Sequence, residues 1–313
     1  MVDVHKEEFI DDGCNYMTEE ESEAFRKMAT PLEFDSSNIK NKYLNVSYGP
    51  LPEQLIDIYL PEEGDGPFPV IFYTHGGGWS MGSKTNGFLD GIIGAIHKGY
   101  AVISVDYRLA PHVTFPEFIF DVKSAIRWAR AHAAEYNFNP ELFGIAGDSA
   151  GGNIALTIGF TADRPEYSGS KYGWAGYSDG VQVVCDMFGP SILSTDRSKF
   201  FRESGVKIAF KRAADKSEPY KQVFGTINEN ILGLFSPLNQ VHKDIPPVLI
   251  LHGAIDGVVP YQHSTLLYDK IKEVCGNDRA QFILYEDINH ADYRFNTQDN
   301  CDEIVRFFDR YLK

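Results

Sequence analysis

A single serine stands among small residues at 144–152, in the stretch GIAGDSAGG. Gly147, Ser149 and Gly151 have the G-x-S-x-G spacing of a sharp strand-to-helix turn that exposes its central serine. Glycine two positions to either side leaves room for so tight a turn. The hydroxyl would lie at the N-terminus of the following helix, where the helix dipole favours developing negative charge. We therefore predict that Ser149 is a catalytic nucleophile.

A serine is a poor nucleophile at neutral pH, so it needs a general base, and the base needs an acid that orients it. Both candidates lie downstream of Ser149, each in a loop after an apolar run: Asp256 in AIDGVVP and His290 in EDINHADY. The carboxyl ends of strands are where such sheets collect their chemistry. We predict Asp256 as the acid and His290 as the base. The alternatives are His252 for the base, and Glu286, Asp287 and Asp292 for the acid.

Attack on a carbonyl group also needs hydrogen-bond donors for the oxyanion. The stretch THGGGWSMG at 74–82 follows an apolar run, and its bare backbone can turn N–H groups toward the serine. We predict an oxyanion hole formed by the N–H groups of Gly77, Gly78 and Ala150.

Aromatic side chains are the candidates for substrate contacts. Trp79 follows the glycine run, and Phe224 lies in a later aromatic-rich insertion. The segment 166–180 carries further aromatic rings that could stack on a sugar or a phenolic acyl group, and packing within the loop is an equal alternative. We predict Trp79, Tyr177 and Phe224 as substrate-binding residues. The aromatic residues of the segment are Tyr167, Tyr172, Trp174 and Tyr177.

Other polar residues beside these motifs are interpreted as structural. Asp106 and Arg108, in VDYRLAP, are predicted to form an ion pair at the end of a strand. Asp148 is predicted to brace the serine turn, and His75 to hold the glycine run in shape.

Short apolar runs predict the strands that position these loops. From residue 69 onward such runs alternate with segments of helical period, as in a parallel sheet covered by helices on both faces. Two earlier segments, 43–49 and 54–61, alternate apolar and polar residues and predict a partly solvated antiparallel pair. Together they predict an α/β fold with an eight-stranded, mostly parallel sheet. The later runs are 70–74, 100–107, 142–147, 181–188, 247–253 and 281–286.

Helical periodicity predicts the layers that cover the sheet. Residues 118–137 and 301–312 each place apolar side chains on one face, and 150–162 continues from the serine turn as a helix. Near the start, Thr18 and Glu21 have capping-box spacing ahead of a short covering helix.

The domain organisation follows from these elements. We expect one domain, 1–313, with an N-terminal covering segment at 1–42. One long connection, at about 191–236, breaks the alternation of strands and helices, and its aromatic residues argue against disorder. We predict that it forms a small helical cap over the carboxyl edge of the sheet.

Composition limits the partners. The 313 residues include 29 Lys and Arg against 44 Asp and Glu, a net charge of −15 without any basic run. This balance argues against nucleic acid and anionic membranes as partners. The four cysteines lack disulfide-framework or metal-ligand spacing, so we expect free thiols and no metal or other cofactor.

The first residues suggest a compartment. MVDVHKEEFIDDG lacks the basic and apolar regions of a signal peptide, and no apolar run approaches the length of a membrane span. We expect a cytoplasmic protein, unless an export signal has been removed.

The motifs carry a family resemblance. HGGGW, DYRLAP, GDSAGG and the pair HGAIDGVVP and NH resemble the α/β-hydrolase superfamily, in particular esterases similar to hormone-sensitive lipase and to the BD-FAE group of feruloyl and acetyl-xylan esterase-like proteins. The resemblance runs from about residue 43 to 313. Its acid loop, DGVVP, is more similar to the BD-FAE group. Asn153 departs from the pattern, because relatives often have histidine there, and the cap matches no motif of the family.

The resemblance implies the α/β-hydrolase fold, a triad of Ser149, Asp256 and His290, an oxyanion hole, and metal-free ester hydrolysis. We therefore expect a serine carboxylesterase that hydrolyses short-chain esters through an acyl-enzyme, on a small-molecule or oligosaccharide ester such as an acetyl or feruloyl ester of a plant carbohydrate. Alternatives with the same triad are an aryl formamidase and a lipase-like esterase. A non-catalytic binding protein on this fold is disfavoured, since the whole triad is present. The sequence leaves a homodimer open.

Overall fold

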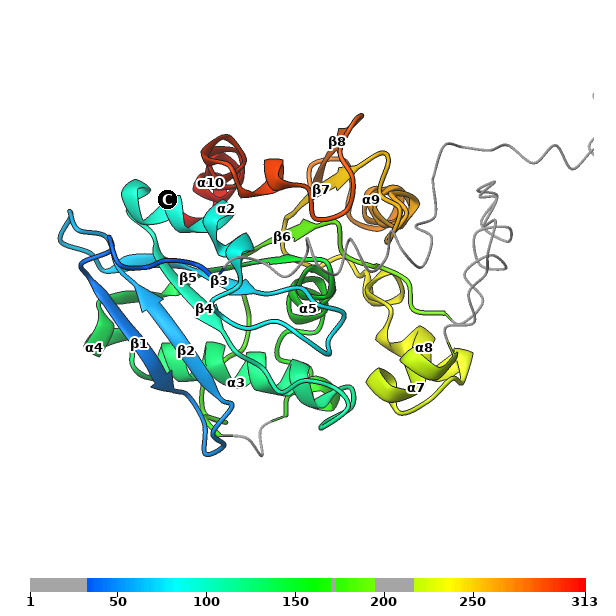
Figure 1. Cartoon of the computed structure of the whole chain (residues 1–313), viewed down its shortest axis with the longest axis horizontal. Coiled ribbons are helices and arrows are strands. Elements are labelled where there is room, and N and C mark those ends of the chain that lie inside the picture. The colour runs from blue at the N-terminus through cyan, green and yellow to red at the C-terminus, as the bar shows by residue number, and fades with distance from the viewer. Residues whose placement is uncertain (1–32, 170–172, 195–216) are drawn as a thin grey trace, which may run out of the picture.

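The computed structural model describes residues 33–169, 173–194 and 217–313 (Figure 1). The covering helix predicted near Thr18 and Glu21, and all of the segment 1–42 before residue 33, lie outside the described residues. The same holds for Tyr172 and for 195–216 within the predicted cap.

Eight strands form one sheet in the order β1-β2-β4-β3-β5-β6-β7-β8. From β4 to β8 neighbouring strands are parallel, whereas β2 pairs antiparallel with both β1 and β4. The predicted eight-stranded, mostly parallel sheet is therefore confirmed. The strands are β1 (Lys42–Ser47), β2 (Leu55–Tyr59), β3 (Phe68–Thr74), β4 (Ala101–Val105), β5 (Phe138–Asp148), β6 (Val183–Met187), β7 (Val248–Gly253) and β8 (Ala280–Tyr285).

The alternating sequence predicted that both strands of the leading antiparallel pair are partly solvated, but only β1 is. β1 lies at the edge of the sheet and is largely exposed, as a solvated strand should be. β2 lies between β1 and β4, and the side chains from Ile56 to Tyr59 are buried, including that of Asp57. The polar residue in β2 therefore marks a buried hydrogen-bonding site rather than a solvent-facing side of the strand.

Helices cover both faces of the sheet. Apolar side chains of α3, α5 and α9 join one core cluster, and those of α2 and α10 join a second cluster on the other face. Figure 1 shows α3 and α10 on opposite sides of the strands. The helical elements are η1 (Gly87–Leu89), α2 (Asp90–Ile93), η2 (Gly94–Lys98), α3 (Glu117–Ala131), α4 (Ala133–Tyr136), α5 (Ala150–Phe160), η3 (Pro165–Tyr167), α7 (Ser217–Phe224), α8 (Glu229–Phe235), η5 (Pro237–Gln240), α9 (Gln262–Cys275), η6 (Tyr293–Asn296) and α10 (Gln298–Leu312).

The helix predicted at 118–137 is interrupted at His132. This residue adopts φ −103° and ψ 15°, which ends α3 and begins the short α4. Its ring Nδ1 donates a hydrogen bond to the carbonyl of Trp128 at 2.8 Å, and the two rings stack. A side chain that bonds the backbone one turn earlier competes with helix continuation, and no glycine or proline signals the break.

The described part of the predicted cap is helical. Of the described residues 191–194 and 217–236, Ser217–Phe224 form α7 and Glu229–Phe235 form α8, and α7 lies against the loop that follows β3, at the carboxyl edge of the parallel strands. The N–H of Phe115 donates to the carbonyl of Val223 at 2.8 Å, and the ring of Phe224 packs edge-on against Trp79 with centroids 5.2 Å apart. These contacts place α7 beside the glycine run.

The described ranges also bear on membrane spans and on the cysteines. In 33–169, 173–194 and 217–313, none of the helices combines the length and hydropathy that crossing a bilayer requires. Cys185, Cys275 and Cys301 are free thiols, and Cys14 lies outside the described residues.

Candidate active site

The serine turn is the strand-to-helix junction between β5 and α5. Ser149 has φ 50° and ψ −117°, a strained conformation for a residue with a side chain. A Cβ at Gly147 would collide with the carbonyl of Gly151, and a Cβ at Gly151 would collide with the carbonyl of Thr74. The prediction that both glycines are needed for steric reasons is therefore confirmed. Strain of this kind is found where a nucleophile must be held in one position.

A hydrogen-bonded relay runs from the serine into the protein. The Oγ of Ser149 lies 3.0 Å from Nε2 of His290, and Nδ1 of His290 lies 2.7 Å from Oδ2 of Asp256. His290 and Asp256 are buried, with 6% and 1% of their surface exposed. The structure thus brings together the three residues that the sequence proposed as nucleophile, base and acid.

These three residues follow β5, β7 and β8, so all of them lie at the carboxyl edge of the parallel strands. The alternative acids have other surroundings. Asp287 and Asp292 both pair with Arg294 at 2.9 Å, and Glu286 is exposed. Asp256 is therefore the carboxylate that orients His290.

Asp256 is held as an anion by its surroundings. Its Oδ1 accepts hydrogen bonds from the N–H groups of Val258 at 2.8 Å and Val259 at 2.7 Å. Burial raises the pKa of Asp256, but the charge of His290 and hydrogen bonds from His252 and His290 outweigh burial and leave this pKa below its ordinary value. A charged Asp256 can stabilise the imidazolium that forms when His290 takes a proton.

His252, the alternative base, ends β7 as the sequence suggested, but it also contacts the acid. Its Nε2 lies 3.2 Å from Oδ2 of Asp256. The side chain is fully buried, and the Oγ of Ser149 bonds His290 rather than His252. This contact has no signal in the sequence, because the histidine and the aspartate meet only through the fold of the loop between them.

The glycine run after β3 approaches the serine turn. Gly77 has φ 109° and Gly78 has φ 59°, which favour glycine and turn the backbone away from an extended course. Within the described ranges, the N–H groups of Gly77, Gly78 and Ala150 meet no acceptor of the chain itself. The N–H of Ala150 belongs to the first turn of α5, where the helix leaves donors unpaired. These three groups are therefore available to a bound oxyanion.

Asp148 joins the serine turn to the glycine run. Its Oδ1 accepts hydrogen bonds from the Tyr73 hydroxyl at 2.6 Å and from the Gly76 N–H at 3.0 Å. Burial raises the pKa of Asp148 to about 6, although both of these hydrogen bonds lower it. The predicted bracing role is confirmed, and it extends to the glycine run as well.

His75 holds the glycine run, as predicted. Its Nδ1 donates to the carbonyl of Gly76 at 2.8 Å, and its ring stacks on Tyr107 with centroids 4.3 Å apart. Burial lowers the pKa of His75 to about 4, so the ring is neutral at neutral pH. A neutral, stacked ring in this position acts as a structural support.

The predicted ion pair between Asp106 and Arg108 is wrong, although both residues are structural. Arg108 Nε bonds Asp121 at 2.9 Å, and Arg108 also pairs with Glu117 at 3.1 Å. Asp106 Oδ1 instead accepts from the backbone N–H of Lys84 at 2.6 Å. The strand end directs the two side chains to different neighbours, which the spacing of two residues could not show.

The predicted substrate-binding aromatic residues lie in two places. Trp79 and Phe224 are buried and in contact with each other beside the glycine run. Tyr177 lies next to Ser178, whose carbonyl accepts from Arg130, and the same arginine bonds the carbonyl of Pro140 at the start of β5. Ser149 follows the other end of β5, so the structure does not bring Tyr177 to the nucleophile, and its contact with a substrate stays a prediction.

Phe188 supports the site and was missed by the sequence interpretation. It follows β6 with φ 46°, and its ring meets His290 edge-on, with centroids 4.9 Å apart. Phe295 packs on its other side at 4.5 Å. A positive φ at a phenylalanine is a rare conformation that the one-letter sequence does not reveal. Phe188 limits the movement of the imidazole ring.

The described residues contain no group of three or more His, Cys, Asp and Glu side chains placed to hold a metal ion. The arrangement itself supplies an activated hydroxyl, a base with an anionic partner and unpaired N–H donors. Such a set can perform nucleophilic attack on a carbonyl carbon.

Comparison with known proteins gives a family. The BD-FAE family model matches residues 56–271, which include Ser149 and Asp256, while His290 lies beyond the match. Esterase LipC of Mycobacterium tuberculosis is 29% identical over 260 residues, covering 82% of this chain and 60% of LipC. The chain also covers only 56% of a second relative from that organism, the probable carboxylic ester hydrolase LipM. The chain thus spans little more than half the length of these relatives.

Solved structures agree on the fold. A truncated carbohydrate esterase from gut microbiota has a TM-score of 0.72 and 27% identity, covering 89% of this chain and 99% of that chain. Esterase 2 of Thermogutta terrifontis with bound propionate has a TM-score of 0.68 at 22% identity, over 88% of this chain and 96% of that chain. The predicted α/β-hydrolase fold is confirmed.

Proposed function

Because the chain belongs to the BD-FAE family, we propose that it is a serine esterase that hydrolyses carboxylic esters through an acyl-enzyme intermediate. The observation that carries this proposal is the continuous relay from Ser149 through His290 to Asp256, at 3.0 and 2.7 Å. Similarity to proteins named as esterases supports the same activity.

The first half of the proposed reaction acylates the enzyme. Asp256 accepts the Nδ1–H of His290, which leaves Nε2 free to take the proton of Ser149 as its Oγ attacks the ester carbonyl carbon. The carbonyl oxygen becomes an oxyanion that accepts hydrogen bonds from N–H groups of Gly77, Gly78 and Ala150. When the carbon–oxygen bond to the alcohol breaks, the alcohol oxygen takes the proton from His290 and leaves.

The second half releases the acid. Water gives a proton to Nε2 of His290 and attacks the acyl carbon. The oxyanion that forms is held by the same N–H groups. The bond to Ser149 then breaks, Oγ recovers its proton from His290, and the carboxylic acid leaves. All the proton transfers use one nitrogen, so the held orientation of the ring serves both halves.

For the substrate, we propose a short acyl group, acetyl or feruloyl, on a plant carbohydrate. The support is the similarity to a carbohydrate esterase and to the BD-FAE family. Trp79 and Phe224 lie beside the glycine run but are buried against each other, so the support for this substrate comes from the similarity alone.

Two measurements test these proposals. Hydrolysis of p-nitrophenyl acetate should fall by about 10⁶ in kcat in Ser149→Ala, because a triad nucleophile is lost. A variant that keeps most of the wild-type rate would refute the esterase proposal. For the substrate, acetylated and feruloylated oligosaccharides should be compared with alkyl esters of the same acids and with N-formylkynurenine. A preference for the formamide would replace the carbohydrate-ester proposal with an aryl formamidase.

A further inference from the structure

A second histidine shares the carboxylate of Asp256. Resting on the function proposed above, we propose that His252 is a positioning residue that holds the Asp256 carboxylate in the orientation His290 needs, and that Ser264 holds the His252 ring in place for this role. Neither residue contacts the Oγ of Ser149, which bonds His290.

The geometry at Asp256 leaves each oxygen fully used. Oδ1 accepts from two backbone N–H groups of its own loop, those of Val258 and Val259. Oδ2 lies 2.7 Å from Nδ1 of His290 and 3.2 Å from Nε2 of His252. Because the loop fixes Oδ1 and the second histidine fixes Oδ2, the carboxylate cannot rotate without losing a donor.

The neighbours of His252 decide which nitrogen carries the proton. Nε2 lies 2.8 Å from the carbonyl oxygen of Val259 as well as 3.2 Å from Asp256, and both partners can only accept. Nε2 must therefore be the donor. Nδ1 lies 2.7 Å from the Oγ of Ser264, and a hydroxyl can donate to it. The Val259 carbonyl and Asp256 thereby select the Nε2–H tautomer, and Ser264 fixes the orientation of the ring by donating to Nδ1, as outer hydrogen bonds do for other functional histidines.

Two rigid elements fix His252 in place. It ends β7, which is buried between β6 and β8, and it is bonded to Ser264 in the first turn of α9. His290, in contrast, lies in the connection after the edge strand β8. The carboxylate of Asp256 is thus fixed by a residue of a central strand. It in turn fixes the orientation of His290, which lies nearer the edge of the sheet.

The charged groups around His252 also matter for a test that varies pH. Asp256 and His290 lie on one side, and the buried carboxyl of Asp186 on β6 is close enough for the charge of His252 to lower the pKa of Asp186. Burial nevertheless raises the pKa of Asp186 to about 7. The measurements below are therefore made at one pH, above neutrality, where this group is ionised.

The test is a set of variants assayed with p-nitrophenyl acetate. His252→Phe keeps a ring but removes the donor, and we expect kcat to fall about 10–100-fold with KM unchanged, as for a lost hydrogen bond to a charged group. His252→Gln can place an N–H near the position of Nε2 and should recover most of the rate. His242→Phe is the matched control, because His242 bonds the carbonyl of Phe160 instead, and its kcat should equal that of wild type.

A double-mutant cycle separates positioning from general damage. In an Asp256→Asn background, His252→Phe should lower kcat by less than about threefold, because its action passes through the carboxylate. Equal factors in both backgrounds, or a wild-type kcat in His252→Phe, would overturn the inference.

Ser264→Ala provides a milder variant should His252→Phe not fold. It removes the hydrogen bond to Nδ1 and leaves the His252 ring less firmly oriented, so kcat should fall several-fold, and an unchanged kcat also counts against the proposal. Failure of the esterase proposal has a different result, since wild type would then show no hydrolysis that depends on Ser149.

Discussion

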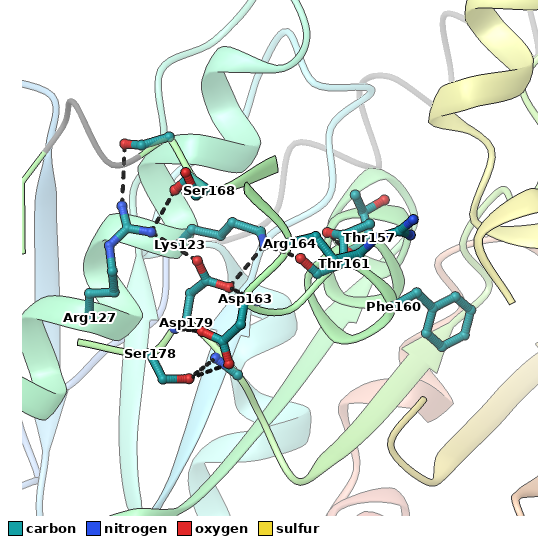
Figure 2. A network of polar contacts seen from close by, with 12 residues as sticks. Lys123, Arg127, Thr157, Phe160, Thr161, Asp163, Arg164, Ser168, Ser178 and Asp179 are labelled. Carbon is teal, nitrogen blue, oxygen red and sulfur yellow. Dashed lines mark hydrogen bonds and ion pairs between the residues drawn. The ribbon is translucent and has the colours of Figure 1, made fainter. Parts of the chain in front are cut away.

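At the N-terminus of helix α5, Ser149 faces a histidine and an aspartate, whereas at the C-terminus of the same helix the carbonyl of Thr161 accepts a hydrogen bond from Lys123 at 2.6 Å. Both regions bury an aspartate between two nitrogen-bearing side chains. Asp256 lies between two histidines, and Asp179 lies between Lys123 and Arg127, each at 2.9 Å (Figure 2).

The donors around Asp179 are all engaged with the protein. Nη1 of Arg127 bonds both Asp179 and the carbonyl of Ser168, and its Nη2 and Nε bond the carbonyl groups of Gly169 and Gly173 in the connection after α5. Burial lowers the pKa of Lys123, and the charge of Asp179 acts in the opposite direction. The network stabilises the fold at the amino edge of the sheet and has no group left for a substrate.

The relay at the other end of α5 differs in two respects. Its partners are histidines, which can exchange a proton near neutral pH, whereas lysine and arginine normally remain charged. One nitrogen, Nε2 of His290, faces a reactive hydroxyl rather than a backbone carbonyl. A buried carboxylate can therefore take part in catalysis when its partner is titratable and has a second nitrogen free to contact a reacting group. The dipole of α5 suits both ends, since its N-terminus favours an anion and its C-terminus a cation.

The largest effect expected from this comparison is on the rate. Asp256→Asn should lower kcat by about 10⁴, because an amide favours the wrong tautomer of the base while keeping the shape of the side chain. Steady-state hydrolysis of p-nitrophenyl acetate measures it. A loss of less than tenfold would mean that Asp256 is structural, like Asp179.

Asp179→Asn should act on stability instead. Removing the anion leaves Lys123 and Arg127 buried without their counter-charge, which should lower the free energy of unfolding by about 3–5 kcal/mol. Urea unfolding measures this loss, while kcat per folded molecule should stay at the wild-type value. Asp65→Asn, at an exposed aspartate, is the control and should change stability by no more than about 0.5 kcal/mol. A large loss of kcat in folded Asp179→Asn would break the comparison.

Asp186 is a third buried carboxyl group, which differs from both Asp256 and Asp179 in having no cationic side chain of the described residues hydrogen-bonded to it. Its Oδ1 accepts from the Gly189 N–H at 2.9 Å, and burial raises its pKa from an ordinary 3.8 to about 7. Since the folded state binds this proton more tightly than the unfolded state, the group's contribution to stability is fully present below about pH 4 and is lost as the pH rises through about 7.

Asp186→Asn cannot titrate, so its stability should lack that contribution to the pH dependence. Urea unfolding of both proteins at a series of pH values between 4 and 8 measures the difference. Parallel stability curves for the variant and the wild type would show that Asp186 is already satisfied as an anion.

The smallest effect is expected at Tyr177. It is 46% exposed and lies at the amino edge of the sheet with the Asp179 network. Tyr177→Ala should therefore leave kcat/KM for an oligosaccharide ester within about twofold of wild type, as for other exposed substitutions. A larger decrease would show that the substrate reaches across to this edge.

The sequence was most informative where the requirement is local. Continuous apolar runs predicted β3 to β8, because a strand buried on both faces has few other compositions available, and alternation predicted β1 and β2. The spacing around Ser149 predicted the serine turn for the same kind of reason, since the two glycines face backbone atoms directly.

Contacts made across the fold could not be predicted in this way. Arg108 pairs with Asp121 on α3 rather than with Asp106, and His252 contacts Asp256. Such side-chain partners depend on how the elements approach each other. The place of Tyr177 could not be predicted for the same reason, since composition suggested stacking but the topology places this residue near the start of β5, at the end opposite Ser149. The break at His132 depends on one side-chain hydrogen bond that helical periodicity does not contain.

The relay also makes a demand on folding. Its hydrogen bond from Ser149 to His290 joins residues 141 positions apart, and it forms only when β5 to β8 have paired in parallel. Each such pairing must close a long loop, and the entropy lost in doing so is offset only after the strands are in contact. These pairings are therefore slow compared with helix formation. Helical signal should therefore return before hydrolysis when the denatured chain refolds. An activity assay would time the closing of the β7–β8 edge, which spectroscopy of the helices cannot do.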